Sequence, residues 1–140
     1  MIGNIVQVGT VVSVDNATGK ARVKIGDLDT QPIIVMQLKS GNIKLHWMPS
    51  PGEQVTVIAP SGDMARAFVM GSLPIDGNMV APDANSPTMD LGGGTLRIIG
   101  DLYVEGTITV TTDVIANGVS LVHHTHGGVL PGAASTAEPN

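Results

Sequence analysis

Between Leu96 and Val110 the sequence alternates apolar and polar residues. Each even-numbered residue of this segment is apolar or glycine, and the odd-numbered residues are polar apart from Ile99 and the amphipathic Tyr103. Because successive side chains of a strand point to opposite faces, the pattern predicts a long β-segment with one apolar stripe. The alternation continues less cleanly as far as Val122.

This apolar stripe requires a partner. A segment of about 30 residues with a single aromatic side chain buries too little surface to fold alone. The stripe must be covered either by the rest of the chain or by other copies of the same segment. Residues 76–90, which precede it, are rich in Pro, Gly, Asn and Asp and are expected to form a surface linker. The linker favours other copies, and three strands can close around a dry axis without an open edge, so we expect a trimer.

The first 75 residues have the composition and spacing of a small β-barrel. The chain is 42% hydrophobic but has one Trp, one Tyr and one Phe, together with 18 Gly and 9 Pro, which is typical of short strands joined by many turns. Strands are expected at Val6–Val14, Lys20–Ile25 and residues 32–38, 54–59 and 66–70. About five short strands without helical periodicity predict an all-β closed barrel, for which the OB-fold is the commonest solution.

Three of the four histidines, His123, His124 and His126, lie within four consecutive positions. In an extended chain the imidazoles of His124 and His126 point to the same side, and His123 points to the other. Two such imidazoles are half of a typical metal shell, although a pair of this kind can also belong to an exposed tail. Asn117-Gly118 predicts a turn or bulge that can shift the phase, so the choice of ligands depends on its form.

A trimer would complete the metal shell. Two nitrogens from each of three chains make six, which does not suit tetrahedral zinc. Six imidazoles suit octahedral Fe(II), Co(II) or Ni(II), and availability favours iron. No coordination position would stay open, so the metal is expected to be structural and to fasten three chain ends. Small residues follow at Gly127-Gly128, Pro131-Gly132 and Ala133-Ala134 and suit a taper, although a floppy tail is the alternative.

Charge and motifs argue against two other classes of function. The net charge is -5 and all seven Lys and Arg residues lie at or before Arg97, so the rest of the chain should not bind nucleic acid. The alternative function is an OB-fold protein for single-stranded nucleic acid or for assembly. The first 75 residues of the chain hold six basic and five acidic residues, and their aromatic residues are Trp47 and Phe68. This composition does not suit a positively charged groove in which bases stack on aromatic side chains.

An enzyme is not expected. The chain has no cysteine nucleophile and no Gly-x-Ser-x-Gly elbow, and Glu138 is the one acidic residue after Asp113. No apolar run approaches the roughly 20 residues of a membrane helix. Residues 1–4 lack the basic region and apolar core of a signal peptide, so synthesis in the cytoplasm is expected.

Several motifs occur together in a recognisable order. The most specific is the run Asn117–Leu121 followed by His124–Gly128. The others are Gly3–Val11, His46–Pro49, Pro51–Val55, Gly71–Leu73 and Asp113–Ala116. With these motifs, essentially the whole chain resembles the central spike family (baseplate assembly protein V) of contractile-tailed phages and related tailocins, in its short Mu-like form.

The resemblance implies a homotrimer. Its parts would be an N-terminal OB-fold in residues 1–75, an intertwined triple-stranded β-helix in residues 91–122 and a pointed apex in residues 123–140, with residues 76–90 as the linker. Some members of the family also hold calcium and chloride on the axis, and the resemblance assigns these ions to no particular residue of this chain.

The resemblance also implies a metal site and a role. The family's His-x-His pair from three chains binds one buried iron near the tip, which maps onto His124 and His126; the additional His123 departs from the family pattern. The spike is a virion component at the tip of the tail baseplate, where hub and tail-tube proteins contact its N-terminal domain. Sheath contraction drives it into the host outer membrane. Without a lysozyme-like insertion, we expect puncture to be mechanical and the protein to be non-enzymatic.

Overall fold

The computed structural model describes residues 5–75, 77–80, 83–128 and 132. The chain divides into two units, Met1–Gly92 and Gly93–Asn140. Strands and two single turns of 3-10 helix make up the regular structure of the described residues, which confirms the all-β prediction. Neither helical turn is long and apolar enough to cross a membrane.

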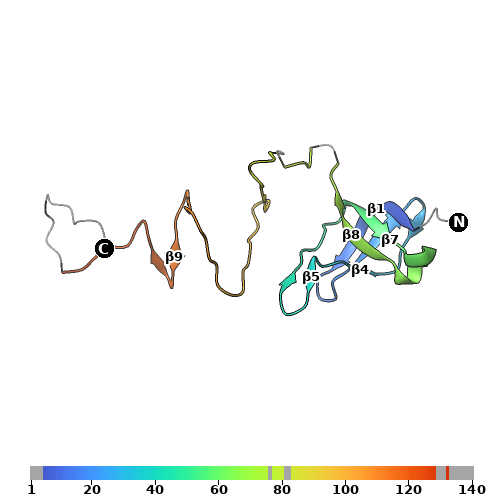
Figure 1. Ribbon diagram of the computed structural model, residues 1–140, viewed down its shortest axis with the longest axis horizontal. Coiled ribbons are helices and arrows are strands. Elements are labelled where there is room, and N and C mark those ends of the chain that lie inside the picture. The colour runs from blue at the N-terminus through green and yellow to red at the C-terminus, as the bar shows by residue number, and fades with distance from the viewer. Residues whose placement is uncertain (1–4, 76, 81–82, 129–131, 133–140) are drawn as a thin grey trace. The chain divides into compact units, whose positions relative to one another are not determined.

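Five strands of the first unit close into a barrel (Figure 1). They are β1 (Val6–Asp15), β2 (Lys20–Ile25), β4 (Ile33–Val35), β7 (Gln54–Ile58) and β8 (Phe68–Leu73). Strand β1 pairs with both β2 and β7, β7 pairs with β8, and β4 links β8 back to β2. The β4–β8 pair is parallel and the other pairs are antiparallel. This closed five-stranded barrel is the architecture that the sequence predicted.

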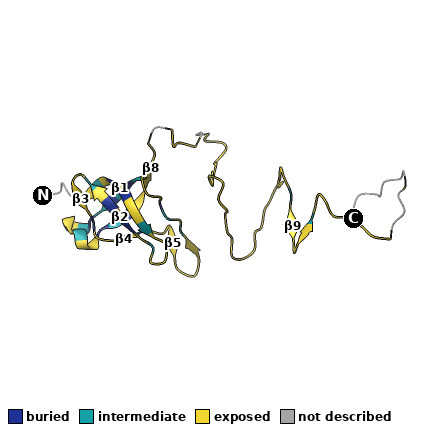
Figure 2. Ribbon diagram, turned by 180° about the vertical axis from the view of Figure 1, so that it is seen from behind, coloured by how far each residue is buried: buried dark blue, intermediate teal, exposed yellow. Residues whose placement is uncertain are grey.

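Valines fill the barrel. Val23, Val55, Val57 and Val69 are fully buried, and buried residues lie along the inner faces of the strands (dark blue in Figure 2). Burial alternates along β2 and β7, as period-two patterning requires. The buried hydroxyl of Thr30 accepts the backbone N–H of Val23 at 3.0 Å, so its oxygen has a hydrogen-bond partner in the core.

Several short elements were not predicted from the sequence. They are β3 (Leu28–Asp29), β5 (Lys39–Ser40), β6 (Lys44–Leu45), η1 (Pro60–Gly62) and η2 (Met64–Arg66). Each spans two or three residues. No hydrophobic period can be read from so short a segment, so pattern analysis misses them.

Two predicted strands have different ends in the structure. The strand expected at residues 32–38 stops at Val35, because Leu38 donates its N–H to the carbonyl of Leu45 at 3.1 Å in the separate β5–β6 hairpin. The strand expected at residues 66–70 begins at Phe68, because η2 occupies the preceding residues.

The second unit contains one hairpin and a long irregular segment. Residues 93–114 form no assigned strand, and the chain bends at Gly100, at residues 105–106 and at residues 111–112. Strand β9 (Ile115–Ala116) then pairs antiparallel with β10 (Val119–Ser120). Asn117-Gly118, which was expected to form a turn or a bulge, forms a turn between these two strands. The β-pattern therefore does not run straight to Val122, because the hairpin reverses the chain.

Candidate metal centre

A tight turn precedes the histidine cluster. Asn117 and Gly118 both have positive φ, 48° and 81°. This is the backbone of a two-residue type I′ turn, for which Asn-Gly is a preferred pair. Ser120 pairs with Ile115 across the hairpin, so the chain returns beside its own starting point just before the histidines.

The side chain of Asp113 joins the two ends of this hairpin. Its Oδ1 accepts the backbone N–H of Val114 at 2.8 Å and that of Val122 at 3.2 Å. The backbone adds a further bond, from the N–H of Leu121 to the carbonyl of Val114 at 2.8 Å. The hydroxyl of Ser120, which donates to this carboxylate, is the main cause that holds the pKa of Asp113 below its usual range.

The hydroxyl of Ser120 also contacts the histidine cluster. Its Oγ accepts the backbone N–H of His123 at 2.7 Å. A serine hydroxyl has one hydrogen to donate and lone pairs that accept, so it can serve the Asp113 carboxylate and the His123 N–H at the same time. The hairpin and the histidine segment are therefore linked through one side chain.

The ring of His124 is held by backbone carbonyls. Its Nδ1 lies 2.9 Å from the carbonyl oxygen of Ser120 and 3.0 Å from that of Leu121. A carbonyl oxygen can only accept, so Nδ1 carries the hydrogen and the neutral ring keeps its lone pair on Nε2. Metal-binding histidines commonly donate their other N–H to a backbone carbonyl in this way.

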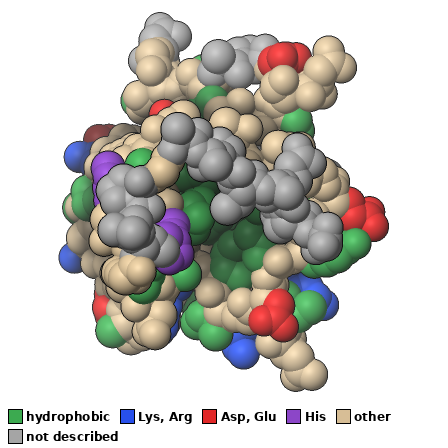
Figure 3. All heavy atoms as spheres, turned by 90° about the vertical axis from the view of Figure 1, so that its left-hand side faces the viewer, with side chains coloured by type: hydrophobic (Ala, Val, Ile, Leu, Met, Phe, Trp, Pro, Cys, Tyr) green, Lys and Arg blue, Asp and Glu red, His purple; other side chains and the backbone are tan. Residues whose placement is uncertain are grey.

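The structure brings the rings of His124 and His126 together. Their centroids are 5.1 Å apart and their planes meet at 80°. All three histidines of the cluster are exposed, and histidine side chains are visible at the surface (purple in Figure 3). The fourth histidine, His46, belongs to the first unit and is not part of this group.

One chain does not supply a complete metal shell. Among the described residues, no group of three or more His, Cys, Asp or Glu side chains could hold a metal ion. The pair offers two imidazole side chains, a ligand type that iron accepts, and further ligands would have to come from other chains. The later part of the expected apex, including Pro131, Ala133 and Glu138, lies outside the described residues.

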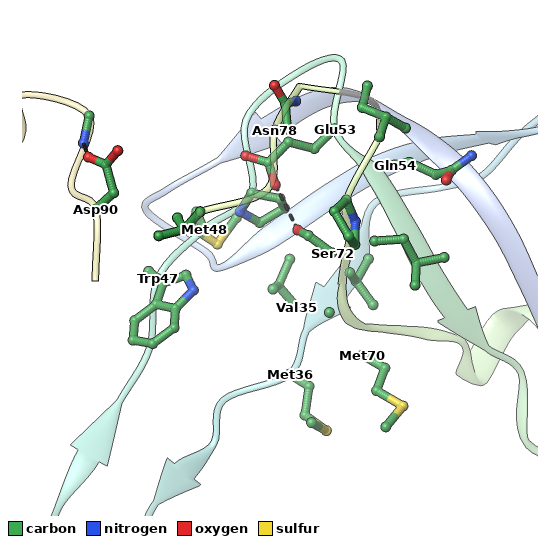
Figure 4. Close-up of a pocket in the computed structure, with 18 of the residues that line it drawn as sticks. Val35, Met36, Trp47, Met48, Glu53, Gln54, Met70, Ser72, Asn78 and Asp90 are labelled. Carbon is green, nitrogen blue, oxygen red and sulfur yellow. Dashed lines mark hydrogen bonds between the residues drawn. The ribbon is translucent and has the colours of Figure 1, made fainter. Parts of the chain in front are cut away.

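The first unit carries an open groove of 1040 Å³ beside β4 and β8 (Figure 4). Trp47, Met36 and Met70 line it, and Glu53 accepts a hydrogen bond from Ser72 at 2.7 Å within it. Its charged lining residues are Glu53 and Asp90, with no Lys or Arg among them. Binding of a nucleic-acid strand requires positive charge along the groove, so this surface does not favour the nucleic-acid alternative.

The barrel and the histidine segment lie in two regions that match known protein families. Residues 7–73 match the type VI secretion system/phage-baseplate injector OB domain, and residues 118–140 match the GpV apex motif. The fold and these matches define the class of protein, an injector-type OB-domain protein. Together with the curated relative below, these matches support a phage baseplate spike family, as the resemblance of the motifs predicted.

A curated relative supports the same family. The spike protein of Escherichia phage P2 is 27% identical to this chain over 88 residues, which are 63% of this chain and 41% of that protein. The match therefore spans less than half of the relative's length. Baseplate spikes are virion components of the tail, and the family is structural rather than defined by a catalytic activity.

Sequence reasoning found the histidines and missed the residues that hold them. Asp113 precedes the hairpin and Ser120 ends its second strand, so the reversal of the chain at the turn brings their side chains close together. The signal was present in part, since Asn117-Gly118 predicted a reversal of the chain. A carboxylate before such a turn and a hydroxyl after it, as at Asp113 and Ser120, are brought close together when the chain reverses.

Proposed function

We propose that this protein is a trimeric central spike that pierces the host outer membrane mechanically when the tail sheath contracts. The observation that carries the proposal is the uncovered apolar stripe. In the single chain, the apolar even-numbered side chains from Leu96 to Val110 are 42–68% exposed. Soluble proteins rarely leave a long apolar stripe open to water, so the stripe calls for a partner.

In the proposed trimer, residues 76–90 are the linker, residues 91–122 form an intertwined triple-stranded β-helix and residues 123–140 form the apex. The bends in the irregular segment support a winding course. Gly100 and Gly106 have φ of 130° and 147°, a region that residues with a side chain rarely enter. Each bend lets the next extended stretch turn its stripe back toward a common axis.

His124 and His126 of three chains would hold one iron through six imidazole nitrogens. The adjacent rings and the backbone carbonyls at Nδ1 of His124 support this assignment. Bound there, the metal would supply a structural clip that opposes fraying of the chain ends. Any calcium or chloride on the axis is assigned to no residue.

The proposed role is mechanical, without catalysis. Interchain pairing gives a thin rod its stiffness, and burying the stripe on the axis keeps the rod from adhering to the bilayer it crosses. From Ile98 onward the chain has acidic residues and no Lys or Arg, so the rod has no electrostatic attraction for nucleic acid. The N-terminal barrel would attach the spike to the baseplate hub and the tail tube.

Paired variants on the two faces of one segment test the proposal. Leu102→Asp with Val104→Asp places charge on the stripe, whereas Thr107→Asp with Thr109→Asp places equal charge on the opposite face. We expect sedimentation to show that the first variant loses the trimer and the second keeps it. Contractile particles that carry the first variant should fail to depolarise host cells, with electron microscopy as the check that they assemble. A trimeric first variant, or assembled particles with wild-type depolarisation, would contradict the proposal.

A further inference from the structure

The ring of His124 is held at the end of the β9–β10 hairpin. Two carbonyls receive its Nδ1–H, those of Ser120 and Leu121. Both carbonyls belong to the end of the β9–β10 hairpin, so their direction depends on how that end is held. The side chain that holds it is Asp113, nine residues before Val122 in sequence and bonded to the N–H of Val122 at 3.2 Å.

We propose that Asp113 is a positioning residue for the histidine pair, acting through the N–H of Val122 and selecting Nε2 of His124 as the ligating atom. This inference rests on the metal role proposed above for His124 and His126. Asp113 itself touches no metal in this account. Asp113 determines that Nε2 of the His124 ring faces away from the hairpin, and it sets the direction in which Nε2 points.

The contacts form one chain from carboxylate to ring. The Asp113 carboxylate accepts the N–H of Val122 at 3.2 Å, and the carbonyl of the same peptide group, that of Leu121, lies 3.0 Å from Nδ1 of His124. The hydroxyl of Ser120 accepts the N–H of His123 at 2.7 Å. The bond to His123 fixes the backbone that enters His124. The carbonyls of Ser120 and Leu121 are then directed at Nδ1.

This arrangement has the form of a secondary metal shell. A metal-binding histidine needs its second nitrogen occupied, because the bond at that nitrogen fixes the tautomer and the ring direction. Loss of such a partner typically weakens metal binding by about tenfold to a hundredfold. If these contacts closed the hairpin without orienting the ring, variants that keep the hairpin would leave the tautomer of His124 and the metal affinity unchanged.

The test uses the full chain with Fe²⁺ as the probe, added without oxygen and measured by competition with a chelator. Asp113→Ala removes the carboxylate, and Ser120→Ala removes the hydroxyl. The conservative variants Asp113→Asn and Ser120→Thr keep an acceptor oxygen and a hydroxyl at these positions. Asp101→Asn, outside the hairpin, is the control. We expect Fe²⁺ binding to weaken by about tenfold to a hundredfold in the alanine variants. The two conservative variants should restore most of it, and the control should match the wild type.

A second readout does not depend on metal. Nitrogen NMR of the metal-free chain reports the tautomer of His124, which should be Nδ1–H in the wild type and mixed in both alanine variants. Unchanged affinity and tautomer in those variants would overturn the inference while the metal site stands. If the wild type binds no Fe²⁺ but His124 is in the Nδ1–H tautomer, the metal proposal is overturned, and with it the claim that Nε2 is the ligating atom. The claim that Asp113 orients the ring of His124 would still stand. Ser120→Ala keeps the test decisive if Asp113→Ala fails to form the hairpin.

Discussion

At the scale of single residues, the barrel leaves no room for a side chain at Gly9. A Cβ built there would lie 2.5 Å from Cγ1 of Val23 and 2.7 Å from the backbone oxygen of Lys24. A side chain could move, but the oxygen belongs to the neighbouring strand and cannot move without disturbing its pairing. The glycine therefore permits a close approach of β1 and β2.

Gly9→Ala should lower the free energy of unfolding of the barrel by about 1–3 kcal/mol, the usual cost of forcing an extra methyl into a packed site. Gly71→Ala is the matched control, because Gly71 also lies in a strand and a Cβ there meets nothing within 4 Å. Urea unfolding of the two variants measures the difference. Equal stability of both variants would show that the strands separate freely at Gly9.

Asp15 gives the barrel a dependence on pH. Its carboxylate accepts the hydroxyl of Thr18 at 2.6 Å and the N–H of Ala17 at 3.0 Å. The Thr18 hydroxyl is the main cause that lowers the pKa of Asp15, followed by the Ala17 N–H. A carboxyl group with a lowered pKa in the folded state stabilises the fold above its ordinary value of about 4, and this contribution disappears as the pH falls through the lowered value.

Asp15→Asn should therefore be less stable than the wild type at pH 6, and the gap should narrow as the pH falls below about 4. Urea unfolding at several pH values measures this gap. Asp27→Asn, which removes the charge of an exposed aspartate outside this turn, is the control for the loss of one negative charge. A gap for Asp15→Asn that stays constant down to pH 2 would contradict the assignment.

At the scale of elements, the β9–β10 hairpin depends on its turn. Replacing Gly118, at φ 81°, with alanine puts a Cβ in the left-handed region, at a cost of roughly 1–2 kcal/mol. Gly118→Ala should increase amide exchange at Leu121, whose N–H bonds the carbonyl of Val114. Asn117→Gly keeps a residue that accepts positive φ and should leave exchange close to that of the wild type. Protection of Leu121 that survives Gly118→Ala would show that the turn is not what holds the hairpin.

Elements with a repeated pattern were predictable and short ones were not. Strands β1, β2 and β7 lie at their predicted positions because alternation over five or more residues specifies both the strand and its buried face. The two-residue β5 and β6 depend instead on where the chain leaves the barrel after Val35. The links among Asp113, Ser120 and His123 were equally hidden, since they exist only after the hairpin has formed.

At the scale of the whole molecule, the two units differ in whether their apolar side chains are buried within the single chain. The barrel buries its own valines in a core within the chain. The segment after Gly93 leaves its apolar stripe exposed, and its histidine pair provides half of a metal shell. We propose that three copies of the same chain meet both needs, as the alternation of residues 96–110 and the spacing of the histidines predict.

The central claim is that three chains share one metal through His124 and His126. Native mass spectrometry with metal analysis on the purified chain tests it most directly. We expect a species of three times 14.4 kDa that carries one iron, and a His126→Ala variant that stays trimeric but loses the metal. A monomeric wild type, or a trimer without bound metal, would contradict the account.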